Sequence, residues 1–267
     1  MRDMGRFNSL EFGKNDAAAQ TTAQNAPEPK FYGEKIKDAQ YFIDAADKAF
    51  YCFDYEEALK MYSKALGIDG GAVPAWSGQA FSLISLGEYH EASMWLRKTV
   101  ELIGESQPIL ALQALVLARS GDFDRACGYA DSALESAGNS PLPWIVRGEI
   151  FYYARRNAEH CFEQACGAAG NDWHTRCLIV DACFFCDRKK LAAMALKFLR
   201  PMVEVYPSKP EVWLRMGRCH TALGMSREAA SALDQVSSLA PDLKILPKFY
   251  AELKNIGLWN RLLGRFR

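Results

Sequence analysis

Two segments of the chain, 137 residues apart, share one arrangement of bulky and small residues although few of their consecutive residues match. Residues 76–92 and 213–229 both begin with Trp, have Gly at the twelfth place and end in Glu-Ala. Steps of 34 residues connect similar residues through the first four units without an insertion. A period of this length indicates an array of stacked supersecondary units. Two series carry it: Phe42, Trp76, Leu110 and Trp144 at a bulky place, and Ala58, Ala92 and Ala126 at a small one.

The spacing of small and large residues predicts two antiparallel helices in each unit. Neither helix can bury its apolar stripe alone, so neighbouring units must stack to share one core. Small residues at places 8 and 20 of a unit let its helices approach closely, and large residues at places 4, 17 and 24 fill the space around that contact. Glycine at place 15 lets the backbone leave the first helix with a positive φ.

This pattern resembles the tetratricopeptide repeat (TPR) family. The resemblance implies an all-α fold, a right-handed helical-repeat solenoid of about six TPR helix pairs plus a C-terminal capping helix. The turn of the fourth unit is two residues short, and the fifth unit has about three extra residues near Trp173. The units are predicted at residues 39–72, 73–106, 107–140, 141–172, 173–209 and 210–243, together 39–243.

Both ends of the chain lie outside this array. Residues 1–38 are predicted to be a mostly disordered arm and linker, since residues 15–29 are polar, Ala-rich and punctuated by Pro. The alternative is that residues 5–13, which contain two Phe and one Leu, dock on a partner or in the protein's own groove. Residues 244–267 are predicted to form a basic amphipathic capping segment. We expect the charged face of this segment to be exposed to solvent. The alternative is that residues 257–267 contact an anionic membrane surface.

Composition narrows the class of protein. The chain has 32 basic and 32 acidic residues, and this zero net charge argues against a nucleic-acid partner. No apolar run approaches the length of a membrane span, and residues 1–13 have no apolar core of the signal-peptide kind. A cytoplasmic location is therefore expected. The eight cysteines are expected to be reduced thiols in that compartment.

A group of cysteines raises the alternative of a zinc site. Cys183 and Cys186 form a CxxC pair, with Cys161, Cys166 and Cys177 nearby. The repeat register places the CxxC pair at interior places of a first helix, and no second CxxC completes a four-ligand set. Packing as small apolar side chains is favoured, so no metal or other cofactor is predicted. The chain also lacks a glycine-rich phosphate loop and a Gly-x-Ser-x-Gly motif, so no catalytic residue is predicted.

In proteins that this chain resembles, the first helices of the units line a concave surface. The places that face it hold apolar and aromatic residues in the first four units, which suits an extended or helical peptide with apolar anchors. The alternative is that some of these rings pack against the next unit or the N-terminal tail. The predicted groove residues are Asp47, Phe50, Tyr51, Phe81, Ile84, Leu115, Arg119, Glu149, Tyr152, Tyr153, Phe184, Arg215 and Arg218.

Charge in the predicted groove is uneven. Asp47 lies near one end, and Arg215 and Arg218 lie near the other, so a bound peptide should place its acidic part near the sixth unit. The residues of the clamp that binds chaperone C-terminal carboxylates are absent, because Ile43 and Pro108 are among those that occupy its places. That class of ligand is not expected.

These observations predict a non-catalytic scaffold or adaptor for protein–protein interaction, which binds a peptide or helix of a partner protein in its concave groove. One alternative is a chaperone of the secretion type that keeps an apolar client soluble. Another is a zinc-dependent regulatory protein. The sequence leaves the oligomeric state open.

Overall fold

The computed structural model describes residues 37–136 and 138–264, with side chains described up to residue 255. The described chain is all-α, and its thirteen helices follow one another as antiparallel pairs with one further helix at the end. The predicted fold class is confirmed. The bounds are α2 (Ala39–Tyr51), α3 (Tyr55–Ile68), α4 (Val73–Leu86), α5 (Tyr89–Ile103), α6 (Gln107–Arg119), α7 (Phe123–Glu135), α8 (Leu142–Tyr153), α9 (Ala158–Ala169), α10 (Trp173–Asp187), α11 (Ala192–Val205), α12 (Pro210–Ala222), α13 (Ser226–Leu239) and α14 (Leu246–Gly264).

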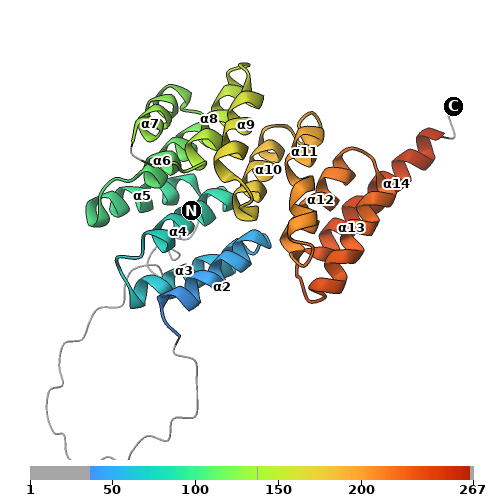
Figure 1. Cartoon of the computed structure of the whole chain (residues 1–267), viewed down its shortest axis with the longest axis horizontal. Coiled ribbons are helices and arrows are strands. Elements are labelled where there is room, and N and C mark those ends of the chain that lie inside the picture. Colours follow the sequence, from blue (N-terminus) through green and yellow to red (C-terminus); the bar gives the residue numbers. More distant parts are fainter. Residues whose placement is uncertain (1–36, 137, 265–267) are drawn as a thin grey trace, which may run out of the picture.

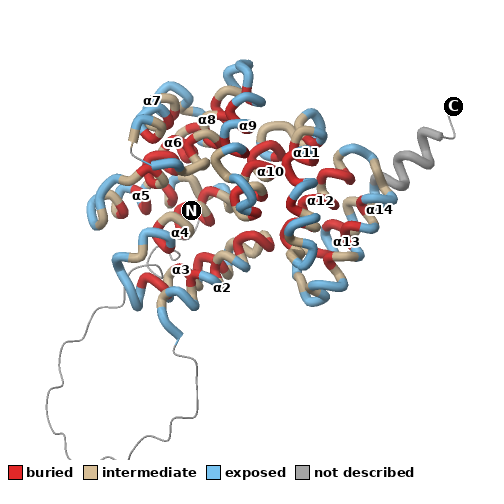
Figure 2. Tube along the Cα trace, in the orientation of Figure 1, coloured by how far each residue is buried: buried red, intermediate tan, exposed pale blue. Residues whose placement is uncertain are grey.

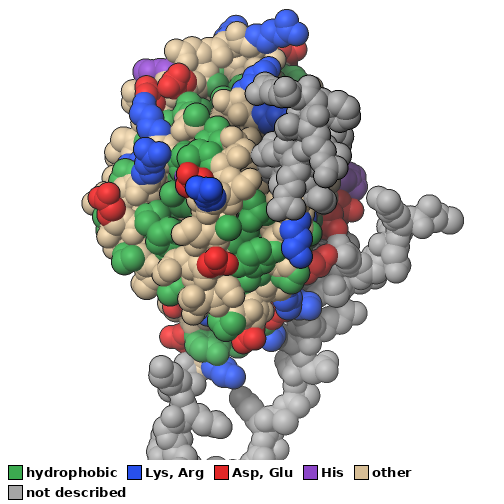
Figure 3. Space-filling model, turned by 90° about the vertical axis from the view of Figure 1, so that its right-hand side faces the viewer, with side chains coloured by type: hydrophobic (Ala, Val, Ile, Leu, Met, Phe, Trp, Pro, Cys, Tyr) green, Lys and Arg blue, Asp and Glu red, His purple; other side chains and the backbone are tan. Residues whose placement is uncertain are grey.

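The helices form two layers. Contacts run from each first helix to the next, through α2, α4, α6, α8, α10 and α12 to α14, and the second helices pack on the outside of their partners (Figure 1). Buried residues follow the helix faces that turn toward neighbouring helices, while outer turns are exposed (Figure 2). On the face at the α12–α13 end, charged side chains of both signs are scattered between hydrophobic ones (Figure 3).

The turns inside five of the six pairs contain a residue in the left-handed region. Place 15 is in the left-handed region in the second unit, where Gly87 has φ 81°, as the repeat pattern predicts. The same conformation occurs without glycine at Phe53, with φ 64°, and at Arg155, with φ 56°. Side chains at the start of several helices accept hydrogen bonds from backbone N–H groups, which would otherwise have no partner in the helix. These residues are Asp38, Asp54, Asp122, Asn157 and Asp172.

The small places of the repeat form the closest contacts between paired helices. Ala46, Ala80 and Ala114 at place 8 are fully buried, and Cys183 occupies the same place in the fifth unit. In the fourth unit this place is Gly148, which faces the buried ring of Phe162 on α9. The helices of this pair approach each other so closely that no side chain fits between them.

We expect Gly148→Ala to lower the free energy of unfolding by about 1–3 kcal/mol, because the core has no room for another methyl group. Its Cβ would lie 2.6 Å from the nearest atom of the Phe162 ring. Gly128, on the exposed side of α7, serves as the matched control, because a methyl group added there would meet no atom within 4 Å. Gly128→Ala should raise stability by about 0.5–1 kcal/mol, because alanine restricts the unfolded chain. Urea denaturation would measure both changes, and equal effects would contradict the packing.

The first pair of helices meets the last part of the array. The rings of Phe53 and Phe249 lie with centroids 5.9 Å apart, and the Lys244 ammonium lies 2.7 Å from a carboxylate oxygen of Asp54. Arg215 donates a hydrogen bond to the main-chain oxygen of Tyr51 at 2.8 Å. The array therefore closes on itself, with the end of α2 and the α2–α3 turn (residues 52–54) against α12 and α14.

The predictions for the two ends are only partly within the described chain. The disordered arm was predicted at residues 1–38. Of these, residues 1–36 lie outside the described residues. In the predicted capping segment, residues 244–267, side chains are described only up to residue 255, so residues 257–267, the candidate for membrane contact, lie outside the described side chains. Earlier in α14, Leu246 and Phe249 are buried against Leu214, Leu233 and Val236 of the sixth pair. Among the described helices, none is both long and apolar enough to cross a membrane.

Candidate functional site

The inner side of the closed array contains a cavity of about 520 Å³. Its lining comes from α2, the α2–α3 turn, the start of α3, and α4, α6, α8, α10, α12 and α14, so residues far apart in sequence converge on it. Aromatic rings dominate this lining: Phe50, Phe53, Tyr55, Phe81, Phe184, Phe185 and Phe249. The cavity reaches the surface at Phe185, which is 40% exposed, and at the exposed Lys248.

The cavity brings together part of the predicted groove. Residues from six of the first helices, which the repeat register placed on the concave side, do line it. The predicted residues in its lining are Phe50, Phe81, Leu115, Arg119, Glu149, Phe184 and Arg218.

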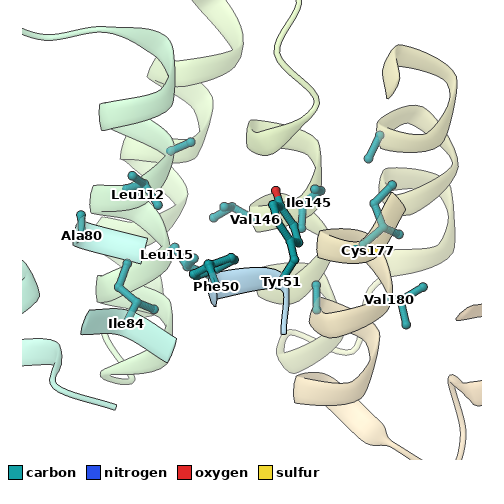
Figure 4. Close-up of a cluster of buried hydrophobic side chains, with 14 of the residues drawn as sticks. Phe50, Tyr51, Ala80, Ile84, Leu112, Leu115, Ile145, Val146, Cys177 and Val180 are labelled. Atoms are coloured by element: carbon teal, nitrogen blue, oxygen red, sulfur yellow. The ribbon is translucent and has the colours of Figure 1, made fainter. Parts of the chain in front are cut away.

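Other predicted groove residues lie elsewhere. Tyr51, Ile84 and Arg215 are buried in the interior, and Arg215 has no exposed surface. The reason is that the end of α2 enters the concave side, with Phe50 directed toward Ile84 and Tyr51 directed toward the helices that hold Ile145 and Cys177 (Figure 4). The structure thus differs from the expected open groove, because the chain itself covers these positions. The ring of Tyr51 packs against Trp173 of the fifth unit, whereas the alternative expected packing against the next unit or the N-terminal tail.

The remaining predicted residues take part in local contacts outside the cavity. Asp47 accepts a hydrogen bond from the hydroxyl of Tyr62, and burial raises the pKa of its carboxyl group. The Tyr152 hydroxyl donates to Asp187 at 2.9 Å. Tyr153 is 41% exposed and lies beside the cavity mouth, with its ring next to Phe185.

One buried ion pair lies in the cavity wall. Arg119 on α6 donates two hydrogen bonds to the carboxylate of Glu149 on α8, at 2.7 and 3.1 Å. Its guanidinium also stacks 3.9 Å from the centroid of the Phe185 ring. Burial disfavours the charged guanidinium, but the Glu149 carboxylate and its hydrogen bonds outweigh this, and the pKa of Arg119 is raised. Glu149 is 1% exposed, so this charge is compensated inside the protein.

A second charge network joins α10 and α12. The carboxylate of Asp181 accepts hydrogen bonds from both Arg215 and Arg218. Burial lowers the pKa of Arg218, whose guanidinium lies 4.8 Å from the centroid of Phe53 and 4.7 Å from that of Phe184. The arginines expected to attract an acidic peptide are therefore committed to Asp181 and to aromatic rings.

The thiols of the cysteine-rich region are core groups. Cys183 and Cys177 have no exposed surface, and burial raises the pKa of the Cys177 thiol to about 12. Burial also raises the pKa of the Cys166 thiol to about 11. A reactive thiolate needs the opposite shift. Within residues 37–136 and 138–255, no three His, Cys, Asp or Glu side chains are placed together to hold a metal ion.

Sequence reasoning missed several cavity residues, chiefly Phe53, Phe185, Asp181, Phe249 and Glu252. Most come from the α2–α3 turn and α14, which reach the cavity only because the array closes. One signal was present, since Phe53 occupies place 15, where the repeat pattern has glycine. A bulky residue at that place projects from the turn into the inner space.

Comparison with known proteins identifies the fold. No family model matches the chain. A monomeric mutant of IFIT1 with Gppp-AAAA matches with a TM-score of 0.50 at 17% identity, covering 72% of this chain and 48% of that one. A TPR protein from Parabacteroides merdae gives a TM-score of 0.49 at 16% identity, with coverage of 82% and 86%. A thermophilic TPR protein from Thermus thermophilus gives 0.45 at 15% identity, with coverage of 80% and 98%.

The described helices thus define a helical-repeat solenoid. This is the fold class that the repeat pattern predicts, and TPR proteins are among the structures to which the chain is similar. Helical-repeat arrays of this kind offer extended concave surfaces for binding.

Proposed function

We propose that this protein is a non-catalytic scaffold that binds a peptide or helical segment of a partner protein at the inner cavity. The observation that carries this proposal is the cavity itself, which gathers seven aromatic side chains around the compensated ion pair of Arg119 and Glu149. Binding energy at protein interfaces comes mainly from a few bulky side chains inserted in such pockets.

The chemistry of the lining supports an apolar anchor with a few polar contacts. The rings of Phe50 and Phe81 meet edge to face with centroids 5.3 Å apart, so this part of the wall is held in place before a partner arrives. Arg119 and Glu149 neutralise each other, so they orient polar groups of a ligand without requiring the ligand to be acidic or basic. A pre-organised wall lowers the entropic cost of binding.

The proposal predicts that a bulky residue at position 85 removes partner binding. Ser85 on α4 lines the cavity, and its hydroxyl donates to the main-chain oxygen of Phe81. Ser85→Trp should fill the space that an anchor needs and lower the yield of the partner complex at least about tenfold, the loss of one hot-spot contact. Affinity purification of the tagged full chain, followed by mass spectrometry, would measure it.

Ser93→Trp is the matched control. Ser93 on α5 is half-buried like Ser85 and also donates to a carbonyl four residues earlier, but it does not line the cavity. This variant should keep the stoichiometric partners of the wild type. Retention of the same partners by both variants would show that the cavity is not the binding site.

A further inference from the structure

Three exposed aromatic rings form a row beside the cavity mouth. Phe123 starts α7, Tyr153 ends α8, and Phe185 lies near the end of α10, with 37%, 41% and 40% of their surfaces exposed. The ring centroids of Phe123 and Tyr153 lie 5.6 Å apart, and those of Tyr153 and Phe185 lie 6.5 Å apart. We call these three residues the aromatic row. Contiguous exposed rings of this kind are typical of interaction surfaces.

Contacts with neighbouring residues hold two rings of the aromatic row, Tyr153 and Phe185, in place. The hydroxyl of Tyr153 donates to the main-chain oxygen of Phe185 at 3.5 Å, which ties the end of α8 to the end of α10. The Arg119 guanidinium stacks on Phe185 at 3.9 Å and is itself held by Glu149. Because Arg119 and Phe185 also line the cavity, the aromatic row continues the cavity wall out to the surface.

Two basic turns flank this row. Residues 154–157, between α8 and α9, and residues 188–191, between α10 and α11, contain five basic residues and no acidic one: Arg155, Arg156, Arg188, Lys189 and Lys190. The ends of α8 and α10 that lead into these turns are joined by the Tyr152 hydroxyl, which donates to Asp187. In a chain with no net charge, this is a local excess of positive charge.

The nearby carboxylates do not neutralise all of these cations. Asp187 accepts from the Tyr152 hydroxyl and from the backbone N–H groups of Lys189 and Lys190, and it pairs with the Lys190 ammonium. These hydrogen bonds lower the pKa of the Asp187 carboxyl group, the bond from the N–H of Lys190 first. Arg188 pairs with Glu252 at 2.6 Å. The exposed side chains of Arg155 and Lys189 have no ion-pair partner among the described residues.

We infer that the aromatic row and the two basic turns form a docking surface for an acidic peptide segment that also bears aromatic or apolar side chains. The inference rests on the proposed function, since it names the charge of the segment that enters the cavity. Charge complementarity supports it, because cations without carboxylate partners lie on both turns, next to rings that accept apolar anchors. It also moves the site for the acidic part of the segment away from Arg215 and Arg218, which both pair with Asp181.

The test starts from a random dodecapeptide phage library selected on the immobilised full-length protein in 50 mM salt. We expect the enriched peptides to be rich in Asp and Glu and to contain Trp, Phe or Tyr. A synthetic copy of the most enriched peptide is then titrated against the wild type and against the double variant Arg155→Glu/Lys189→Glu. The variant should bind at least about tenfold more weakly, and raising the salt to 300 mM should weaken binding to the wild type.

A matched control reverses the same number of charges elsewhere. Arg97 on α5 and Arg227 on α13 are exposed, and neither lies on these turns. Arg97→Glu/Arg227→Glu should bind the peptide as the wild type does. Circular dichroism of each variant checks that it is folded.

Several outcomes would overturn the inference: enriched peptides that are neutral or basic, equal binding by the turn variant, or displacement of the peptide by a single-stranded RNA of twelve nucleotides. Failure of the two proposals can be told apart. If Ser85→Trp removes binding but the turn variant does not, the cavity is the site and the charge inference fails. If only the turn variant removes binding, the surface holds and the cavity proposal fails. No enrichment at all would contradict both.

Discussion

Arg215→Ala should lower the free energy of unfolding by about 3–5 kcal/mol, because it removes one partner from a buried ion pair and leaves the other short of its counter-charge. Arg215 has no exposed surface and donates to Asp181, to the main-chain oxygen of Tyr51 at 2.8 Å and to that of Glu211 at 3.1 Å. It therefore joins α10 and α12 to the end of α2. Urea denaturation followed by circular dichroism would measure the loss.

Arg147→Ala is the control for this variant. Arg147 on α8 pairs with Asp131 on α7, but these side chains are 30% and 53% exposed. An exposed ion pair of this kind contributes about 0–1 kcal/mol, so the loss should be small. Similar small losses for both variants would contradict the burial of Arg215 at the point where the array closes.

Trp76→Ala should also cost about 3–5 kcal/mol, as the removal of a large core side chain does when the site cannot collapse. Trp76 is 1% exposed, its ring centroid lies 4.7 Å from that of Trp95, and its indole N–H donates to the main-chain oxygen of Gly70 at 2.8 Å. The variant loses the packing within the second unit together with the link to the preceding turn. A loss below 1 kcal/mol in urea would show that the register of the second unit is wrong.

Trp144 occupies the same place in the fourth unit but is only half-buried, so Trp144→Ala should cost less than Trp76→Ala. The comparison separates the effect of burial from the identity of the residue. Losses of equal size would contradict the difference in burial between the two units.

The helix pairs could be predicted from the sequence because each unit packs mainly on its neighbours. A small residue at place 8, such as Ala80, and a large one at place 4, such as Trp76, are both consequences of the contact within a pair, and this contact repeats every 34 residues. Local packing of this kind leaves a periodic signal.

The closure of the array could not be predicted in the same way, because it joins residues that occur once. Tyr51 and Arg215 are 164 residues apart, and their contact leaves no period in the sequence. The predicted groove residues that line the cavity all lie on first helices, as Leu115 on α6 and Phe184 on α10 do.

The charge pattern of the inner side held a signal that the sequence reasoning did not use. Asp181 and Arg215 are 34 residues apart, so they occupy equivalent positions in adjacent units and meet across α10 and α12. Glu163 and Lys197, also 34 residues apart, pair on the outer helices α9 and α11, although the extra residues near Trp173 put them at different places of the repeat. Opposite charges at a separation of one repeat therefore indicate an internal ion pair, and such residues are poor candidates for contact with a partner.

The contact between the two ends of the array is the central claim, and zero-length cross-linking with a carbodiimide tests it most directly. Lys244 and Asp54 lie 2.7 Å apart across 190 residues of sequence, with side chains 79% and 29% exposed. Lys197 and Glu163, in adjacent units at 3.2 Å, provide the internal control. We predict that mass spectrometry of the monomeric fraction will find both cross-links. If the cross-link between Lys197 and Glu163 is found but the one between Lys244 and Asp54 is not, the array is open.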